Sequence, residues 1–203
     1  MSEGFAERLR RIVEDTDPIH KWDATIAKGA VSIPEGLMLA MCDVDCGSQT
    51  VGMVKKVLQW RGEDPDGAKA LWDQLQAENE LLAEVLLAGT VVELRNVIGK
   101  IRTRLQELSV RCGVPIEPAE QTALLDALTD GVEGVWGGVV PGAGGYDAVV
   151  LLANDDEETR DRIRGLVATW SKERGSRVRL LDVRGAMEGV KIEDRVDYGV
   201  WLG

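Results

Sequence analysis

A glycine-rich loop between two apolar, strand-length runs is the sequence feature that most constrains the fold. The loop covers residues 141–146, and the apolar runs cover residues 132–140 before it and 148–152 after it. Glycine adopts positive φ without a steric penalty from a Cβ and lets other groups approach the main chain closely. Further glycines within the first run also permit close backbone approach. The sequence therefore predicts a hairpin or a tight pair of strands joined by this loop.

Two interpretations of the loop remain open at this point. Successive amides in a glycine-rich turn can converge on an anion, as in phosphate-binding nests. Equally, the loop is a tight turn between buried strands and nothing more. No Gly-Lys-Ser/Thr sequence follows, and the glycines lead into a strand where the dinucleotide fingerprint must open a helix. The two familiar nucleotide-binding loops are thereby excluded.

Composition limits the class of protein. With 203 residues, 44% of them hydrophobic, the chain can bury a sizeable core and form one domain with appendages. A formal net charge of −11 argues against a broad nucleic-acid or membrane surface. No run reaches the length of a transmembrane helix, and residues 1–7 lack the apolar core of a signal peptide, so we expect a cytoplasmic protein. Three cysteines and one histidine without zinc spacing predict small buried thiols and no metal site.

The remaining periodicity predicts the order β, several α, β, β, α, β. Residues 36–44 are an almost unbroken apolar run, typical of a strand buried on both faces, and residues 177–183 alternate as a last strand. Apolar residues at three- and four-residue steps predict helices at 5–17, 48–61, 68–86, 91–112, 119–128 and 155–174. Residues 62–67 predict a turn, Gly89 and Gly113 predict helix ends, and Pro118 suits the first turn of the helix that follows it. We therefore predict an α+β fold, with a mostly antiparallel four-stranded sheet and helices packed on one face. The expected parts are an N-terminal helix and connecting segment (1–34), the main domain (35–183) and a C-terminal tail (184–203).

A second candidate site follows the first strand. Gly47 and Ser48 form a corner that leads directly into a helix, where free amides would favour an anion. Ser48 is equally well explained as an ordinary N-cap. Lys55 and Lys56 lie beyond the first turn, either as solvated surface or as a positive flank for the same anion. If the strands that precede this corner and the glycine loop are neighbours, the two turns share one rim of the sheet.

Three segments, in one order along the chain, resemble the phosphomevalonate kinase family of eukaryotes, especially fungi. They are GLMLAMCDVDCGSQT (36–50), VPIEP with QTALLD (114–126) and GGVVPGAGGYDA (137–148). The last is similar to the third conserved motif of the GHMP kinase superfamily. The resemblance implies that family's C-terminal, ferredoxin-like domain. It also implies Mg²⁺-dependent phosphoryl transfer from ATP to mevalonate 5-phosphate in isoprenoid synthesis.

The resemblance also implies site residues. Gly142, Ala143, Gly144 and Gly145 correspond to amide donors beside the phosphates, and Gly47 and Ser48 correspond to substrate contacts. Asp147 matches the family position, although the match forces no chemical role on it. No catalytic residue and no metal ligand are carried over, because the family places its ATP loop, metal ligand and catalytic lysine or aspartate in an N-terminal half that this sequence lacks.

We therefore expect the substrate-side domain of a phosphomevalonate kinase that is inactive as an isolated chain. The alternatives are a non-catalytic ligand-binding or interaction domain, and a loop that is only a turn. We further expect an exposed apolar patch, packed by the missing N-terminal kinase half or used in self-association. Nucleic acid and membranes are not expected partners.

Overall fold

The computed structural model describes residues 4–14, 19, 31–44 and 50–183. The chain divides into two units, Met1–Ser32 and Ile33–Gly203. The first unit contains α1 (Phe5–Val13), which confirms the predicted N-terminal helix. All other helices and strands of the described residues belong to the second unit. The predicted tail at 184–203 lies outside the described residues.

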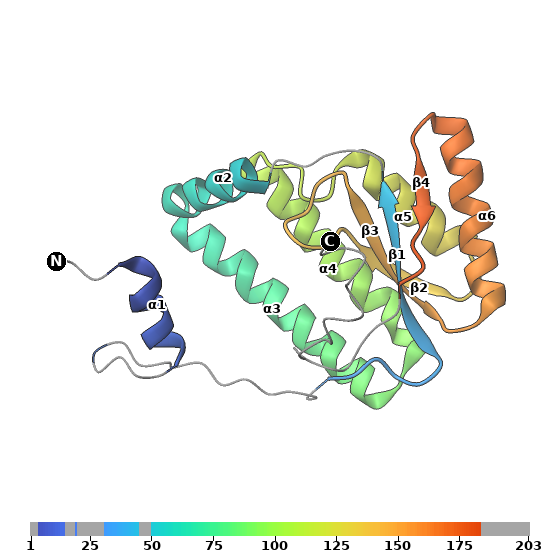
Figure 1. The fold of residues 1–203 in the computed structure, drawn as a ribbon, viewed down its shortest axis with the longest axis horizontal. Coiled ribbons are helices and arrows are strands. Elements are labelled where there is room, and N and C mark those ends of the chain that lie inside the picture. Colours follow the sequence, from blue (N-terminus) through green and yellow to red (C-terminus); the bar gives the residue numbers. More distant parts are fainter. Residues whose placement is uncertain (1–3, 15–18, 20–30, 45–49, 184–203) are drawn as a thin grey trace, which may run out of the picture. The chain divides into compact units, whose positions relative to one another are not determined.

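A four-stranded sheet forms the centre of the second unit (Figure 1). Its strands are β1 (Leu37–Val44), β2 (Val135–Val139), β3 (Ala148–Asn154) and β4 (Val178–Leu180). Their order is β2-β3-β1-β4, and every neighbouring pair is antiparallel. The predicted four-stranded antiparallel sheet and the tight β2–β3 pair are thus confirmed. The strands that lead into the two candidate turns, β1 and β2, are not neighbours as supposed, because β3 lies between them.

Five helices accompany this sheet, with α3 and α4 side by side and α2 packed against those two helices (Figure 1). They are α2 (Thr50–Glu63), α3 (Pro65–Ala88), α4 (Val91–Cys112), α5 (Ala119–Gly131) and α6 (Glu157–Arg174). Gly89 and Gly113 end α3 and α4 in the left-handed conformation, as their positions after the apolar stripes predicted. None of the helices in the described ranges is long and apolar enough to cross a membrane.

Helices pack on both faces of the sheet. On one face, Met38, Ala40 and Cys42 of β1 share a core with α5 and α6. On the other face, Leu152 of β3 joins a core made with α3 and α4. The α+β class is confirmed. We predicted helices on one face of the sheet, and α5 and α6 form that layer. In the structure α4 also packs, against the opposite face of β2.

The prediction that β1 is buried on both faces was wrong. Alternate residues of β1 are buried, but Leu39 between them is 47% exposed. The core formed with α3 and α4 includes only the first residue of β1, Leu37, so it does not cover the rest of this face. An uninterrupted apolar run predicted a strand here correctly but overestimated how much of it is covered.

Two consecutive glycines bring helices close to both faces of β2. A Cβ on Gly137 would lie 2.9 Å from the Ile98 side chain of α4. A Cβ on Gly138 would lie 2.9 Å from Leu125 of α5 and nearer still to the backbone of β3. Side chains at these positions would push the helices away, which explains the glycines that precede the loop.

Burial makes the Cys42 thiol unreactive. Cys42 is fully buried, and desolvation raises its pKa to about 12. The thiol therefore stays protonated at about pH 8, and we expect iodoacetamide to leave it unmodified in the folded chain. Half-buried Cys112 should react first, as measured by mass spectrometry of the Cys46→Ser variant. Cys46 lies outside the described residues. Because the chain has three cysteines, its replacement leaves only the thiols of Cys42 and Cys112 to compare. Equal labelling rates for these two thiols in the folded chain would contradict this prediction.

Candidate functional site

The glycine loop consists of an exposed tip on a buried base. The Gly144 amide donates to the Pro141 carbonyl at 3.2 Å, closing a β-turn with Gly142 and Ala143 at its tip. Gly142 has φ +66°, a value that primed turns require at their second residue. Gly142 and Ala143 are exposed, whereas Gly144 and Gly145 are buried. The loop therefore presents its tip to solvent on a base that is packed within the protein.

Three hydrogen bonds fix the base of this loop. The Gly145 amide donates to the Ile116 carbonyl at 3.0 Å, and the Val44 amide of β1 donates to the Asp147 carbonyl at 2.8 Å. The side-chain amide of Gln121, in the first turn of α5, donates to the Tyr146 carbonyl at 2.6 Å. The segment before α5 and the end of β1 thus hold the loop from two sides.

These bonds narrow the predicted set of amide donors. The amides of Gly144 and Gly145 already donate to carbonyls, so in this conformation they do not face a ligand. No protein acceptor within the described part of the chain takes the amides of Gly142 and Ala143. Asp147 is exposed, and its carbonyl belongs to the contact with β1. An anion at the loop would therefore meet two amides at the tip.

The second candidate turn, Gly47 and Ser48, lies outside the described residues. Its strand, β1, runs parallel to β2 because both are antiparallel to β3. The end of β1 at Val44 and the end of β2 at Val139 therefore lie at the same edge of the sheet. The prediction that both turns share this rim remains a prediction for Ser48 itself.

A buried ion pair between Arg102 and Glu117 lies next to Ile116, whose carbonyl holds the loop. The carboxylate of Glu117 is completely buried and accepts from Arg102 at 2.7 Å, from Gln106 at 2.8 Å and from Thr122 at 3.0 Å. A second nitrogen of Arg102 donates to Asp126 at 2.7 Å. Burial alone would lower the pKa of Arg102, but its hydrogen bonds and charge pairs with the two carboxylates outweigh burial and raise that pKa. The network joins α4 to the start of α5.

The sequence interpretation assigned no role to Ile116, Glu117, Gln121 or Arg102. Ile116 acts through its backbone carbonyl, which leaves no trace in the residue type. Glu117 lies between the end of α4 and the start of α5, and its residue type gives no signal that its carboxylate is buried. A buried carboxylate then requires a cationic partner, but the sequence does not say which arginine supplies it.

A cavity of about 190 Å³ lies beside the loop, between the end of β1 and the helices α5 and α6. Tyr146 and Gln121 form its wall on the loop side, and Arg174 stacks on Trp170 at 4.5 Å on the α6 side. Its remaining lining is Val44, Glu120, Leu124, Ser176 and Val178. This largely apolar lining, with one cation and one carboxylate, is not a phosphate cradle. The described residues also contain no group of three or more histidine, cysteine, aspartate or glutamate side chains arranged to hold a metal.

Two fungal proteins match almost the whole chain. Phosphomevalonate kinase of Gibberella zeae is 50% identical over 199 residues, which are 98% of this chain and 44% of that protein. Phosphomevalonate kinase of Aspergillus fumigatus is 43% identical over 218 residues, which are 99% of this chain and 45% of that protein. The chain is homologous to the C-terminal part of phosphomevalonate kinase. It thus spans less than half the length of these phosphomevalonate kinases. No protein-family model matches it.

Solved structures show the same fold at low sequence identity. A protein from Listeria innocua superposes with a TM-score of 0.60 at 17% identity, over 75% of this chain and 43% of that protein. Mevalonate kinase of L. major, solved in complex with R-mevalonate, gives a TM-score of 0.53 at 18% identity over 74% and 44% of the two chains. The fold expected for the C-terminal domain of a phosphomevalonate kinase, a GHMP kinase, is therefore the fold observed.

Proposed function

We propose that this chain supplies the substrate-side C-terminal part of a phosphomevalonate kinase. The reaction transfers a phosphoryl group from ATP to mevalonate 5-phosphate and yields ADP and mevalonate 5-diphosphate. The observation that carries the proposal is the 50% identity over 98% of the chain to a phosphomevalonate kinase. The fold shared with a mevalonate kinase supports it.

The glycine loop supplies electrostatic stabilisation in this proposal. Phosphoryl transfer needs in-line positioning of donor and acceptor, and hydrogen-bond donors fixed around the developing charge. The tip amides of Gly142 and Ala143 meet that need, because the base of the loop is already fixed by its bonds to the protein. We assign Gly47 and Ser48 to the acceptor substrate and leave Asp147 at the rim without a chemical role.

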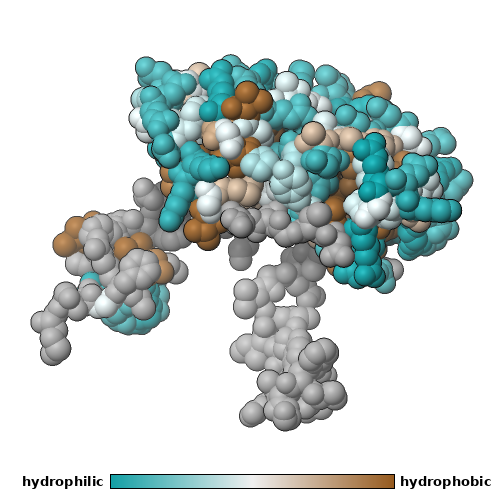
Figure 2. Space-filling model, turned by 90° about the horizontal axis from the view of Figure 1, so that it is seen from above, coloured by the Kyte–Doolittle hydropathy of each residue, from teal (hydrophilic) through white to brown (hydrophobic). Residues whose placement is uncertain are grey.

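We assign ATP and Mg²⁺ mainly to the part of the kinase that this chain does not match. The described residues gather no metal site, and we assign no step to a metal here. An exposed apolar face lies on α2, where Val51, Val54 and Leu58 recur at three- and four-residue steps and are 73%, 46% and 55% exposed. The face seen in Figure 2 is mostly hydrophilic, with separate apolar patches among the charged side chains. We propose that the apolar face of α2 packs against the kinase half or, without it, against a second copy of this chain.

A reconstitution assay tests this function. The chain alone, with ATP, Mg²⁺ and mevalonate 5-phosphate, should give no ADP in a coupled assay. Co-expression with the unmatched part of the Gibberella zeae enzyme should restore turnover, and the same experiment with Gly144→Val should not. Turnover by the isolated chain would overturn the expectation of inactivity. Failure of the reconstituted pair, with mevalonate 5-phosphate still binding in calorimetry, would favour a non-catalytic ligand-binding domain.

A further inference from the structure

We propose that Glu117 is a positioning residue that sets the conformation of the glycine loop. It touches neither the loop tip nor any position assigned to a substrate, and it acts through the peptide bond on its N-terminal side. The consequence for catalysis rests on the proposed function. The consequence for the loop's conformation does not.

The peptide between Ile116 and Glu117 is held at both of its polar ends. Its N–H donates to the Ser109 hydroxyl on α4 at 3.3 Å, and its carbonyl accepts from the Gly145 amide at 3.0 Å. The Cα of Glu117 directly follows this peptide, and its side-chain carboxylate is held by Arg102. A change in the orientation of this peptide would therefore move the acceptor that holds Gly145.

Packing makes this coupling stiff. A Cβ on Gly144 would lie 2.6 Å from the Cα of Ile116, so the loop and this peptide are in direct backbone contact. Ile116 itself packs into the core formed by Trp60, Leu71 and Leu108. The loop cannot follow a different path past Ile116 without displacing the backbone, because closely packed interiors resist such shifts.

The number of groups on the carboxylate also distinguishes Glu117 from an ordinary surface partner of Arg102. Arg102, Gln106 and Thr122 all donate to it, from α4 on one side and α5 on the other. A fully buried carboxylate with three donors from two helices has one orientation. That orientation fixes residue 117 relative to both helices, and so fixes the peptide on which the loop rests.

Hydrogen exchange separates positioning from general stability. In the full chain labelled with ¹⁵N-glycine, the Gly145 amide should exchange about tenfold faster in Glu117→Gln and in Ser109→Ala than in the parent chain, since each variant loosens the peptide that accepts from it. Ser171→Ala is the matched control. Ser171 on α6 also accepts from a backbone amide, that of Val178 at 2.8 Å, and its own hydroxyl donates to carbonyls of Val167 and Val178. This control should leave Gly145 exchange unchanged within about threefold.

Every outcome decides the proposal. If Glu117→Gln does not fold, Ser109→Ala still reports on the same peptide. Gly145 exchange in the folded variants that matches the Ser171→Ala control would overturn the positioning role. In the reconstituted kinase we expect kcat to fall about tenfold in Ser109→Ala, with little change in KM for mevalonate 5-phosphate, because the loop amides act on the developing charge. Loss of turnover with the unaltered chain would refute the proposed function and leave the exchange result standing.

Discussion

Replacing Gly144 by valine should lower the free energy of unfolding by about 3 kcal/mol or more and remove the loop conformation. The position has φ +82°, which a β-branched residue adopts only with strain. Its Cβ would also collide with the carbonyl oxygen of Ile116 and lie 2.6 Å from the Cα of that residue. Both obstacles are backbone atoms, so no side chain can rotate to relieve the contact. Urea unfolding followed by tryptophan fluorescence measures the loss.

Gly142→Ala is the matched control for this prediction. Gly142 also has positive φ, +66°, but a Cβ there meets no atom within 4 Å. Only the conformational penalty applies, and we expect a loss of about 1 kcal/mol. Equal losses for Gly142→Ala and a Gly144→Ala variant would show that φ alone requires glycine at position 144, and that the contact with Ile116 is unimportant.

Replacing Arg102 by leucine should lower the free energy of unfolding by about 3 to 5 kcal/mol, because it leaves the buried carboxylate of Glu117 without its cation. Burial opposes the charge of Arg102, but its hydrogen bonds and charge pairs with Glu117 and Asp126 outweigh burial and raise the pKa of Arg102 in the folded chain. A raised pKa means that the stabilisation is present at all pH values below the unfolded pKa and is lost only above it. The difference between parent and variant should therefore stay constant from about pH 6 to about pH 9 in urea unfolding.

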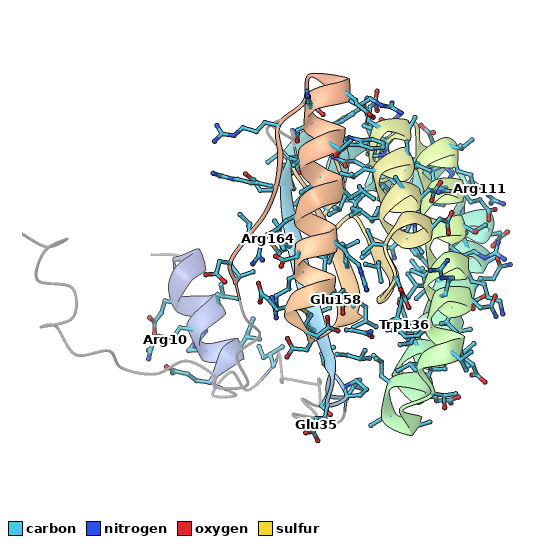
Figure 3. The ribbon with its side chains drawn as sticks, turned by 90° about the vertical axis from the view of Figure 1, so that its right-hand side faces the viewer. Arg10, Glu35, Arg111, Trp136, Glu158 and Arg164 are labelled. Carbon is cyan, nitrogen blue, oxygen red and sulfur yellow. The ribbon has the colours of Figure 1, made fainter. Side chains whose placement is uncertain are left out.

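Two further variants serve as controls for the Arg102→Leu prediction. Arg164→Leu removes an exposed cation from the surface of α6 (Figure 3). Arg164 pairs there with Glu157 and Asp161, and its replacement should not measurably shift the unfolding midpoint. The double variant Arg102→Leu with Glu117→Leu should recover part of the loss, since no buried charge is left unpaired. A single Arg102→Leu variant as stable as Arg164→Leu would contradict a structural role for the buried pair.

Helix boundaries were predictable where glycine or proline marks the end or the start of a helix. Glycines in the left-handed conformation stop α3 and α4 where the apolar stripes end, and Pro118 precedes α5 as expected. The turn predicted at 62–67 was wrong, because it shrinks to one residue between helices. Asp64 caps α3 by accepting from Gly67, while Pro65 occupies the first helical position. Turn-forming residues at this junction start a helix instead of a loop.

The candidate site was only partly predictable, since its geometry depends on long-range contacts. The glycine loop and its flanking strands follow from residue types, but which amides are free depends on whether Ile116 and Pro141 accept from them. The strand order is a further non-local property, and it placed β3 between β1 and β2. The Arg102–Glu117 pair joins α4 to the segment that precedes α5, and no spacing rule connects the two residues.

The consecutive glycines of β2 have a consequence for how the loop is supported. At Gly137 and Gly138 only the backbone of β2 separates the two helix layers, with Ile98 of α4 against one glycine and Leu125 of α5 against the other. A displacement of either helix cannot be absorbed by side chains at these positions, because none are present. We therefore expect a movement of α4 to displace α5 through the strand, and with it the glycine loop that begins two residues beyond β2.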